Sequence, residues 1–218
     1  MEIIIMKNKF KIIVIGCIIL LALIITPACS NNASDHIDKG DNYSEQGKWD
    51  EAIFEYTKAI ALTPDIAVAY CNRAIAYGKT GQLDLALGDL NKAIELDSSL
   101  ASAYSNRGAV YLGTGKFDLA ISDLSRAINL DPYLPEALSN RGWAYFNVEY
   151  YESAIKDLTR AIELDPNLAI AYCNRGWVHY KKSKNDLAVS DFQKTIELSD
   201  DPQLIQAAKE GIKAIKGE

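Results

Sequence analysis

The sequence predicts an all-α protein, an α-solenoid of five helical hairpins followed by one further helix. A period of 34 residues runs from residue 33 to residue 202 without an insertion or a deletion. Within each period, apolar residues recur in two stretches at helical spacing. A fixed period of this length over most of a chain is typical of repeats that stack into a solenoid. The five units are residues 33–66, 67–100, 101–134, 135–168 and 169–202.

The unit 101–134 shows how each hairpin is encoded. Tyr104, Gly108 and Tyr111 fall at i, i+4 and i+7, which places them on one face of a first helix. A second helix carries a similar apolar stripe: Ala120, Ile121, Leu124, Ala127 and Ile128. Two glycines in residues 113–115 favour a stop between the helices. Pro132 ends the second helix, because the residue before a proline is disfavoured in the α region.

Columns of small residues predict that the two helices of each unit pack closely. Glycine inside a helix costs about 1 kcal/mol relative to alanine, which is tolerable where it lets two helices approach. The small residues of the first helices are Gly40, Ala74, Gly108, Gly142 and Gly176. Those of the second helices are Ala52, Ala86, Ala120, Ala154 and Ala188. An aromatic column lies between them, with a histidine in the fifth unit: Tyr43, Tyr77, Tyr111, Tyr145 and His179.

A basic residue precedes an acidic residue by 16 positions in every unit. The pairs are Lys39/Glu55, Arg73/Asp89, Arg107/Asp123, Arg141/Asp157 and Arg175/Asp191. Folding each hairpin about its turn sets the two columns opposite each other. We therefore expect one partly buried ion pair in each unit, which fixes the register of its helices. The alternative is two solvated columns, whose exposed pairs would contribute only about 0–1 kcal/mol each.

The period, the order of small and aromatic columns and the Asp-Pro closures resemble the tetratricopeptide repeat (TPR). The resemblance covers residues 33–202. Its departures are local, with proline replaced at two closures and glycine replaced at two turns: Ser98, Asp200, Glu149 and Ser183. The resemblance implies a right-handed α-solenoid of five helix-turn-helix TPR hairpins. It also implies a protein-interaction module that holds a peptide or an extended segment in the concave groove of its first helices.

Residues 1–28 are predicted to be a signal or membrane-targeting segment, followed by a short tether at 29–34 and the repeats at 35–202. Residues 12–25 have no polar side chain and follow three lysines, Lys7, Lys9 and Lys11. This run is short for a membrane span, which needs about 20 residues, and fits the apolar part of a secretory signal. The lysines favour retention of the N-terminus inside, so we expect the repeats to be exported.

Cys29 is the predicted lipid attachment site. It follows Ala28 at the end of the apolar run and precedes polar residues, and this arrangement resembles a bacterial lipoprotein signal. Thr26 departs from that pattern, in which an aliphatic residue usually stands three places before the cysteine. Ordinary cleavage near Ala28 and an uncleaved anchor at residues 12–28 are the alternatives. All three readings place the repeats outside the cytoplasmic membrane, and lipidation would anchor them to its outer face or to the cell envelope.

The remaining cysteines, Cys71 and Cys173, occupy the same column three units apart. Helices pack about 8–10 Å apart, so three units exceed the roughly 7 Å Cα limit of a disulfide. We expect free thiols. His36 and His179 have no ligand partners nearby in the sequence, so no metal site is predicted.

The chain has a formal net charge of −6, and residues 1–29 contain three lysines and one glutamate, which leaves −8 for the remainder. Nucleic-acid binding would need a basic stripe, so we expect no nucleic-acid partner. The TPR resemblance implies a protein or peptide partner instead. The sequence also lacks a glycine-rich phosphate loop or a nucleophile elbow. We therefore predict no enzymatic activity and no cofactor.

The C-terminal residues 203–218 are predicted to form one more amphipathic helix that caps the fifth hairpin. Its apolar side contains Leu204, Ile205, Ala208, Ile212 and Ile215.

The predicted peptide-binding residues lie on the first helices. An asparagine column would present amides that both donate and accept hydrogen bonds: Asn72, Asn106, Asn140 and Asn174. Four rings of the last two units would form a continuous aromatic strip: Trp143, Phe146, Trp177 and Tyr180. Lys79 and Lys181 flank this face. The alternatives are asparagines that bond their own or the next helix, and rings that pack against neighbouring helices or the C-terminal cap.

Together these features predict an exported, membrane-tethered protein-interaction module that binds an extended segment. The alternative is a structural or oligomerising solenoid that uses its ends or edges rather than its groove.

Overall fold

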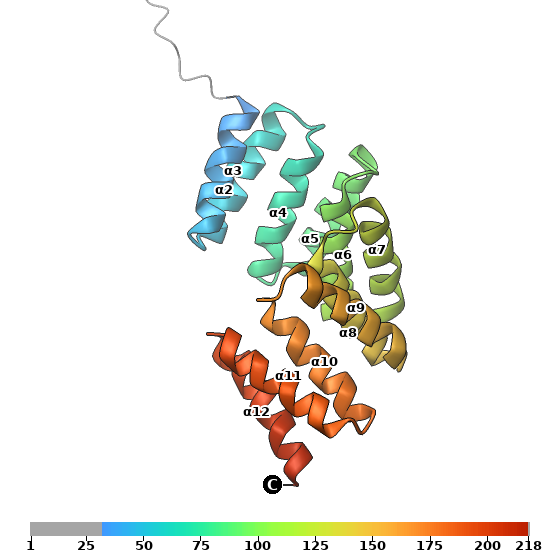
Figure 1. The fold of residues 1–218 in the computed structure, drawn as a ribbon. Coiled ribbons are helices and arrows are strands. Elements are labelled where there is room, and N and C mark those ends of the chain that lie inside the picture. Colours follow the sequence, from blue (N-terminus) through green and yellow to red (C-terminus); the bar gives the residue numbers. More distant parts are fainter. Residues whose placement is uncertain (1–31, 218) are drawn as a thin grey trace, which may run out of the picture.

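The computed structural model describes residues 32–217, and the predicted signal segment and Cys29 lie outside them. Eleven helices and no strand occur in this part of the chain (Figure 1). The first helices of the five units are α2 (Ala33–Glu45), α4 (Ala67–Lys79), α6 (Ala101–Gly113), α8 (Pro135–Asn147) and α10 (Ala169–Lys181). The second helices are α3 (Trp49–Leu62), α5 (Leu83–Leu96), α7 (Phe117–Leu130), α9 (Tyr151–Leu164) and α11 (Asn185–Leu198). The last helix is α12 (Pro202–Lys216).

The helices stack as hairpins in chain order, which confirms the predicted α-solenoid (Figure 1). The two helices of each unit contact each other, and each second helix contacts the first helix of the next unit. First helices of neighbouring units also touch, whereas no contact joins the second helices of neighbouring units within residues 32–217. The first helices therefore lie on the inner side of the curve. We call the side formed by α2, α4, α6, α8 and α10 the inner face.

The small columns form the contact between the helices of each hairpin. All five alanines of the second-helix column are fully buried. A Cβ atom on Gly108 would lie 2.7 Å from Cγ of Leu124, closer than real Cβ contacts allow. Gly142 faces Leu158 in the same way. Glycine at these two positions leaves room for the facing leucine, and alanine, at Ala74, is the largest residue of the column.

The turn inside each hairpin uses a residue with positive φ. Gly47, Gly81 and Gly115 have φ of 70°, 79° and 73°, whereas Glu149 has 64° and Ser183 has 58° at the equivalent positions. Only glycine adopts this region without a steric cost. The turns of the fourth and fifth units are thus strained by their side chains.

Replacing Glu149 with glycine is expected to stabilise the protein by about 0.5–1 kcal/mol. The relief of strain at positive φ, roughly 1–2 kcal/mol, is partly offset by the greater freedom of glycine in the unfolded chain. Chemical unfolding followed by circular dichroism measures the change. Gly115→Ala is the matched control and should destabilise the chain; a Glu149→Gly variant less stable than the parent would contradict the explanation.

Helix α12 packs against α10 and α11 at the end of the stack. Its buried Gly211 faces the ring of Phe192 on α11, and its buried Ala208 belongs to the same cluster. A Cβ on Gly211 would lie 2.4 Å from this ring, and one on Gly176 would lie 2.7 Å from it. Phe192 therefore fills the junction of three helices. Between residues 32 and 217, none of the helices combines the length and apolar character that crossing a bilayer requires.

Candidate functional site

The Arg-Asp pairs of units two to five form bidentate ion pairs. In the second unit Nε of Arg73 donates to Oδ2 of Asp89 at 2.7 Å, and Nη2 donates to Oδ1 at 2.8 Å. Arg107 and Asp123 repeat this geometry at 2.6 and 2.8 Å. The other two pairs, Arg141/Asp157 and Arg175/Asp191, are likewise bidentate. All four aspartates are buried, so these pairs lock first and second helices together at a fixed register.

Each of these arginines also reaches the preceding unit, which sequence reasoning missed. Nη1 of Arg107 donates to Oδ1 of Asn91 on α5 at 2.7 Å. The same contact recurs with a polar residue 16 positions before each arginine, at 2.7 to 3.2 Å: Thr57, Asn91, Ser125 and Thr159. One guanidinium thus joins three helices of two units. The signal in the sequence was this further column of short polar side chains on the second helices.

The predicted Lys39/Glu55 pair of the first unit is wrong. Oε2 of Glu55 lies 2.5 Å from Nδ1 of His36, and Oε1 accepts from Nζ of Lys58 at 3.2 Å. Burial raises the pKa of Glu55, but the hydrogen bonds from His36 and Lys58 outweigh it and hold the pKa below its ordinary value. Lys39 is exposed instead. Within residues 32–217 no unit precedes the first one to supply the polar contact of an arginine, and Glu55 is bound by a histidine and a lysine instead.

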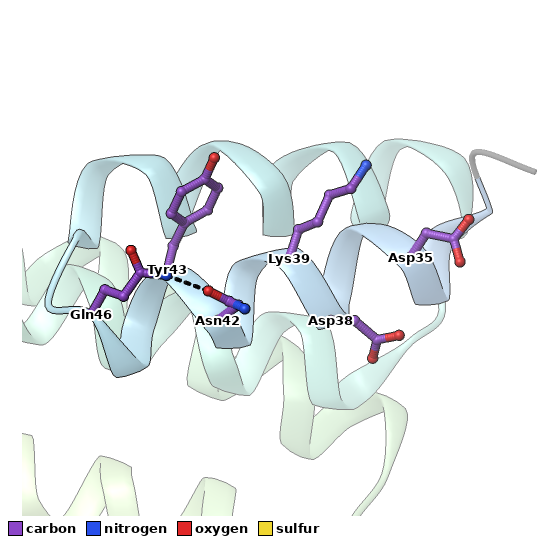
Figure 2. A pocket seen from close by; sticks show the side chains of 6 residues that line it. All are labelled: Asp35, Asp38, Lys39, Asn42, Tyr43 and Gln46. Carbon is purple, nitrogen blue, oxygen red and sulfur yellow. Dashed lines mark hydrogen bonds between the residues drawn. The ribbon is translucent and has the colours of Figure 1, made fainter. Parts of the chain in front are cut away.

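Lys39 lines an open hollow of about 670 Å³ on α2 (Figure 2). The other lining residues are Asp35, Asp38, Asn42, Tyr43 and Gln46, and the amide of Gln46 donates to Asn42. In the second unit the positions of Asp35 and Asn42 are the fully buried Ala69 and Ala76. The exposed start of the stack is therefore polar where internal units are apolar.

The asparagine column behaves unevenly. Nδ2 of Asn72 donates to Oδ1 of Asp41 at 2.9 Å. Asn106 donates to Sγ of Cys71 and Asn174 to Oγ of Ser139, both at 3.5 Å. Each of these amides is held by the preceding first helix, rather than by its own or the next helix. Asn140 has no such partner within residues 32–217 and is partly exposed, so the structure leaves one amide of the column free rather than a ladder.

The four predicted rings form two pairs rather than one continuous strip. The rings of Trp143 and Phe146 stack with centroids 4.7 Å apart. Trp177 meets Tyr180 at 5.9 Å and Phe192 at 5.3 Å, both edge to face. No ring contact joins the two pairs in the part of the chain that the structure describes. The fifth-unit pair packs on the buried cluster beneath α12, so it contributes to the core at the end of the stack.

The two lysines predicted beside these rings, Lys79 and Lys181, are exposed, and neither forms an ion pair within residues 32–217. Cys71 and Cys173 are buried free thiols, and burial raises the pKa of Cys173 to about 11. Cysteines with raised pKa values are poor nucleophiles. No group of three potential metal-ligating side chains occurs in the described part.

His179 replaces the tyrosine of the aromatic column and is buried. Its Nδ1 atom has no hydrogen-bond partner among the described residues, and Nε2 lies 3.8 Å from Oδ2 of Asp191. Burial lowers the pKa of His179 despite the nearby Asp191 carboxylate. The imidazole therefore takes up a proton less readily in the folded than in the unfolded chain.

This shift predicts a pH dependence of stability. Because the unfolded chain binds the proton more tightly, the contribution of His179 to folding is present above its ordinary pKa of about 6.5 and is lost as the pH falls below it. His179→Tyr, which restores the column residue, should lose less stability than the parent between pH 7 and pH 5. Parallel unfolding curves at these pH values test this; equal losses in the two proteins would contradict it.

Comparison with known families and structures agrees with the geometry. A family model described as TPR repeat matches residues 40–81, 79–115 and 150–183. Two models described as tetratricopeptide repeat match residues 101–134 and 169–202. A search of curated proteins found none that matches the sequence.

Solved structures with the same fold are numerous, and three illustrate the likeness. The MamA protein is 27% identical with a TM-score of 0.62, over 76% of this chain and 90% of that one. YrrB, described as a TPR protein with an unusual peptide-binding site, is 24% identical with a TM-score of 0.61, over 83% and 93%. A thermophilic TPR protein of Thermus thermophilus is 18% identical with a TM-score of 0.69, over 83% and 98%. The chain belongs to the tetratricopeptide-repeat family.

Proposed function

We propose that this protein is an exported, membrane-tethered module that holds an extended segment of a partner protein against its inner face. The TPR fold is a protein-interaction fold, and the family points to a non-catalytic role. The observation that carries the proposal is on α8, where the amide of Asn140 has no hydrogen-bond partner within residues 32–217 and the partly exposed ring of Trp143 lies one turn further on. An amide can pair with a peptide backbone, and an aromatic ring can anchor a side chain.

The two ends of the stack favour the inner face over end-to-end assembly. Asp35 and Asn42 place polar groups where the later units have only alanine or valine. At the other end, α12 covers α10 and α11. A polar start and a covering helix are the features that keep a solenoid from extending. The alternative, a structural solenoid that oligomerises through its ends, receives no support from these surfaces.

Site-specific photo-crosslinking tests the inner-face assignment. Ala109 on α6 stands in the same column as Trp143 of α8. A photoreactive amino acid at Ala109 should crosslink a partner in intact cells. The same residue at Ser122, exposed on the second helix α7, is the control. A crosslinked product from Ala109 alone supports the inner face. Crosslinks from Ser122 alone would show that the partner binds the outer helices, and the proposal would fail.

The membrane tether rests on the apolar run at residues 12–25 and on Cys29. Cys29→Ala is expected to prevent lipidation and to move the protein from the membrane fraction to the soluble fraction, because an acyl chain supplies the attachment. Cell fractionation and mass spectrometry of the mature N-terminus measure this. A variant that stays membrane-bound and keeps residues 12–25 would identify an uncleaved anchor. Ser30→Ala is the matched control and should leave attachment unchanged.

A further inference from the structure

One stripe of α8 differs from the equivalent stripes of the other first helices. Glu136, Asn140 and Trp143 lie at i, i+4 and i+7 and therefore share one side of the helix. We call these three residues the α8 stripe. At the position of Glu136, units two, three and five have Val68, Ser102 and Ile170, and their first helices carry no acid in the first turn. The combination of acid, amide and indole occurs in this unit alone within residues 32–217.

None of the three polar or aromatic groups is fully engaged inside the protein. The carboxylate of Glu136 is exposed and forms no ion pair within residues 32–217. Asn140 has no hydrogen-bond partner there, whereas three other asparagines of its column do. The ring of Trp143 is partly exposed and is held from one side by Phe146, which itself meets Tyr151 at 6.0 Å. The α8 stripe therefore holds its three side chains on one side of the helix and leaves them available to a ligand.

The spacing of the stripe defines what fits it. Seven residues of α-helix rise by about 10 Å, at 1.5 Å per residue. An extended chain covers about 3.3 Å per residue, so three residues span the same distance. A ligand that runs along α8 and reaches both Glu136 and Trp143 would therefore place the two contacting side chains three residues apart. The amide of Asn140 would meet the backbone between them.

We infer that the α8 stripe binds an extended segment in which a lysine or arginine stands three residues from a large apolar residue. The cation pairs with Glu136, and the apolar side chain packs on Trp143. Charge favours this choice, because the whole protein is acidic, with a formal net charge of −6, and repels acidic segments. The inference rests on the proposed inner-face function and assigns the chemistry of its partner.

Selection from a display library of random ten-residue linear peptides tests the inference on the full chain in detergent. Enriched peptides should contain Lys or Arg three residues from Leu, Ile, Phe or Trp, in either chain direction. For a selected peptide, Trp143→Ala should weaken binding by about 30-fold, as for a buried aromatic anchor. Glu136→Gln should weaken it by about 3-fold, as for a partly exposed ion pair. Glu51→Gln, an exposed acid in the first turn of α3, is the matched control and should change nothing.

Trp143→Ala could weaken binding by disturbing the fold, so a second variant that reverses the charge of Glu136 separates binding from folding. Glu136 is exposed, so Glu136→Lys should fold normally, reject the basic peptide and bind its counterpart in which glutamate replaces the lysine or arginine. Selected peptides that lack this spacing, or whose affinity does not change with Glu136→Lys, would overturn the inference about the α8 stripe. If Ile75→Arg on α4 abolishes the binding of those peptides, inner-face binding itself still stands. A library with no binder above the empty support overturns the stripe together with the proposed function.

Discussion

Phe192→Ala is expected to lower the free energy of unfolding by about 4 kcal/mol, which is in the range for a buried aromatic residue cut to alanine. Phe192 is fully buried, and its ring lies between Gly176 and Gly211, with the edge of Trp177 beside it. Neither glycine has a side chain that could move into the space. The cavity would open at the junction of α10, α11 and α12, so the last helix should detach first.

Two measurements check this expectation. Denaturant unfolding gives the total loss, and amide hydrogen exchange should show the protection of α12 lost before that of α6 and α7. The matched control is Phe54→Ala on α3, where the residue is 59% exposed and the loss should stay below about 1 kcal/mol. Equal effects of the two substitutions would show that the three-helix junction does not depend on the Phe192 ring.

Arg107→Met is expected to destabilise the chain by about 3 kcal/mol, because Asp123 then stays buried without its partner. The Arg107 side chain is 19% exposed, so some solvent screening places the loss at the low end for buried pairs. The double variant Arg107→Met with Asp123→Leu should recover much of it, since no uncompensated charge remains. A double-mutant cycle on the free energies of unfolding measures the coupling.

The contact of Arg107 with Asn91 supplies an internal comparison. Asn91→Ala removes a neutral acceptor at an exposed site and should cost about 1 kcal/mol or less. If the Arg107 and Asp123 substitutions were strictly additive, the two side chains would not be energetic partners despite their bidentate geometry.

The sequence was sufficient to predict the fold because the same constraint recurs in every unit. Gly108 faces Leu124, and 34 residues later Gly142 faces Leu158 in the same way. A single periodic pattern therefore determined helix order, hairpin packing and most of the charge pairing. Prediction failed where a residue has neighbours unlike those of its column. Lys39 lies at the open start of the stack, so Glu55 pairs with His36 instead.

The candidate site was less predictable for the same reason. Asn140 and Asn174 share a column, but Asn174 is buried against Ser139 while Asn140 stays free within residues 32–217. Trp143 and Trp177 also share a column, and only Trp177 has a phenylalanine of the next helix and α12 beside it. Periodicity assigns residues to a face, whereas the neighbouring helix decides whether a side chain is available to a ligand.

The arginines that join two successive units bear on how the length of this protein could change. Asn91 of unit two and Ser125 of unit three both accept a hydrogen bond from the arginine of the unit that follows them. Removing residues 101–134 would place Arg141 sixteen positions after Asn91, with its acceptor and its own Asp157 both retained. Each internal unit thus makes the same inter-unit hydrogen bonds on both sides, so one unit can replace another. Duplication or loss of whole units would change the length of the inner face and keep the contacts between neighbouring units.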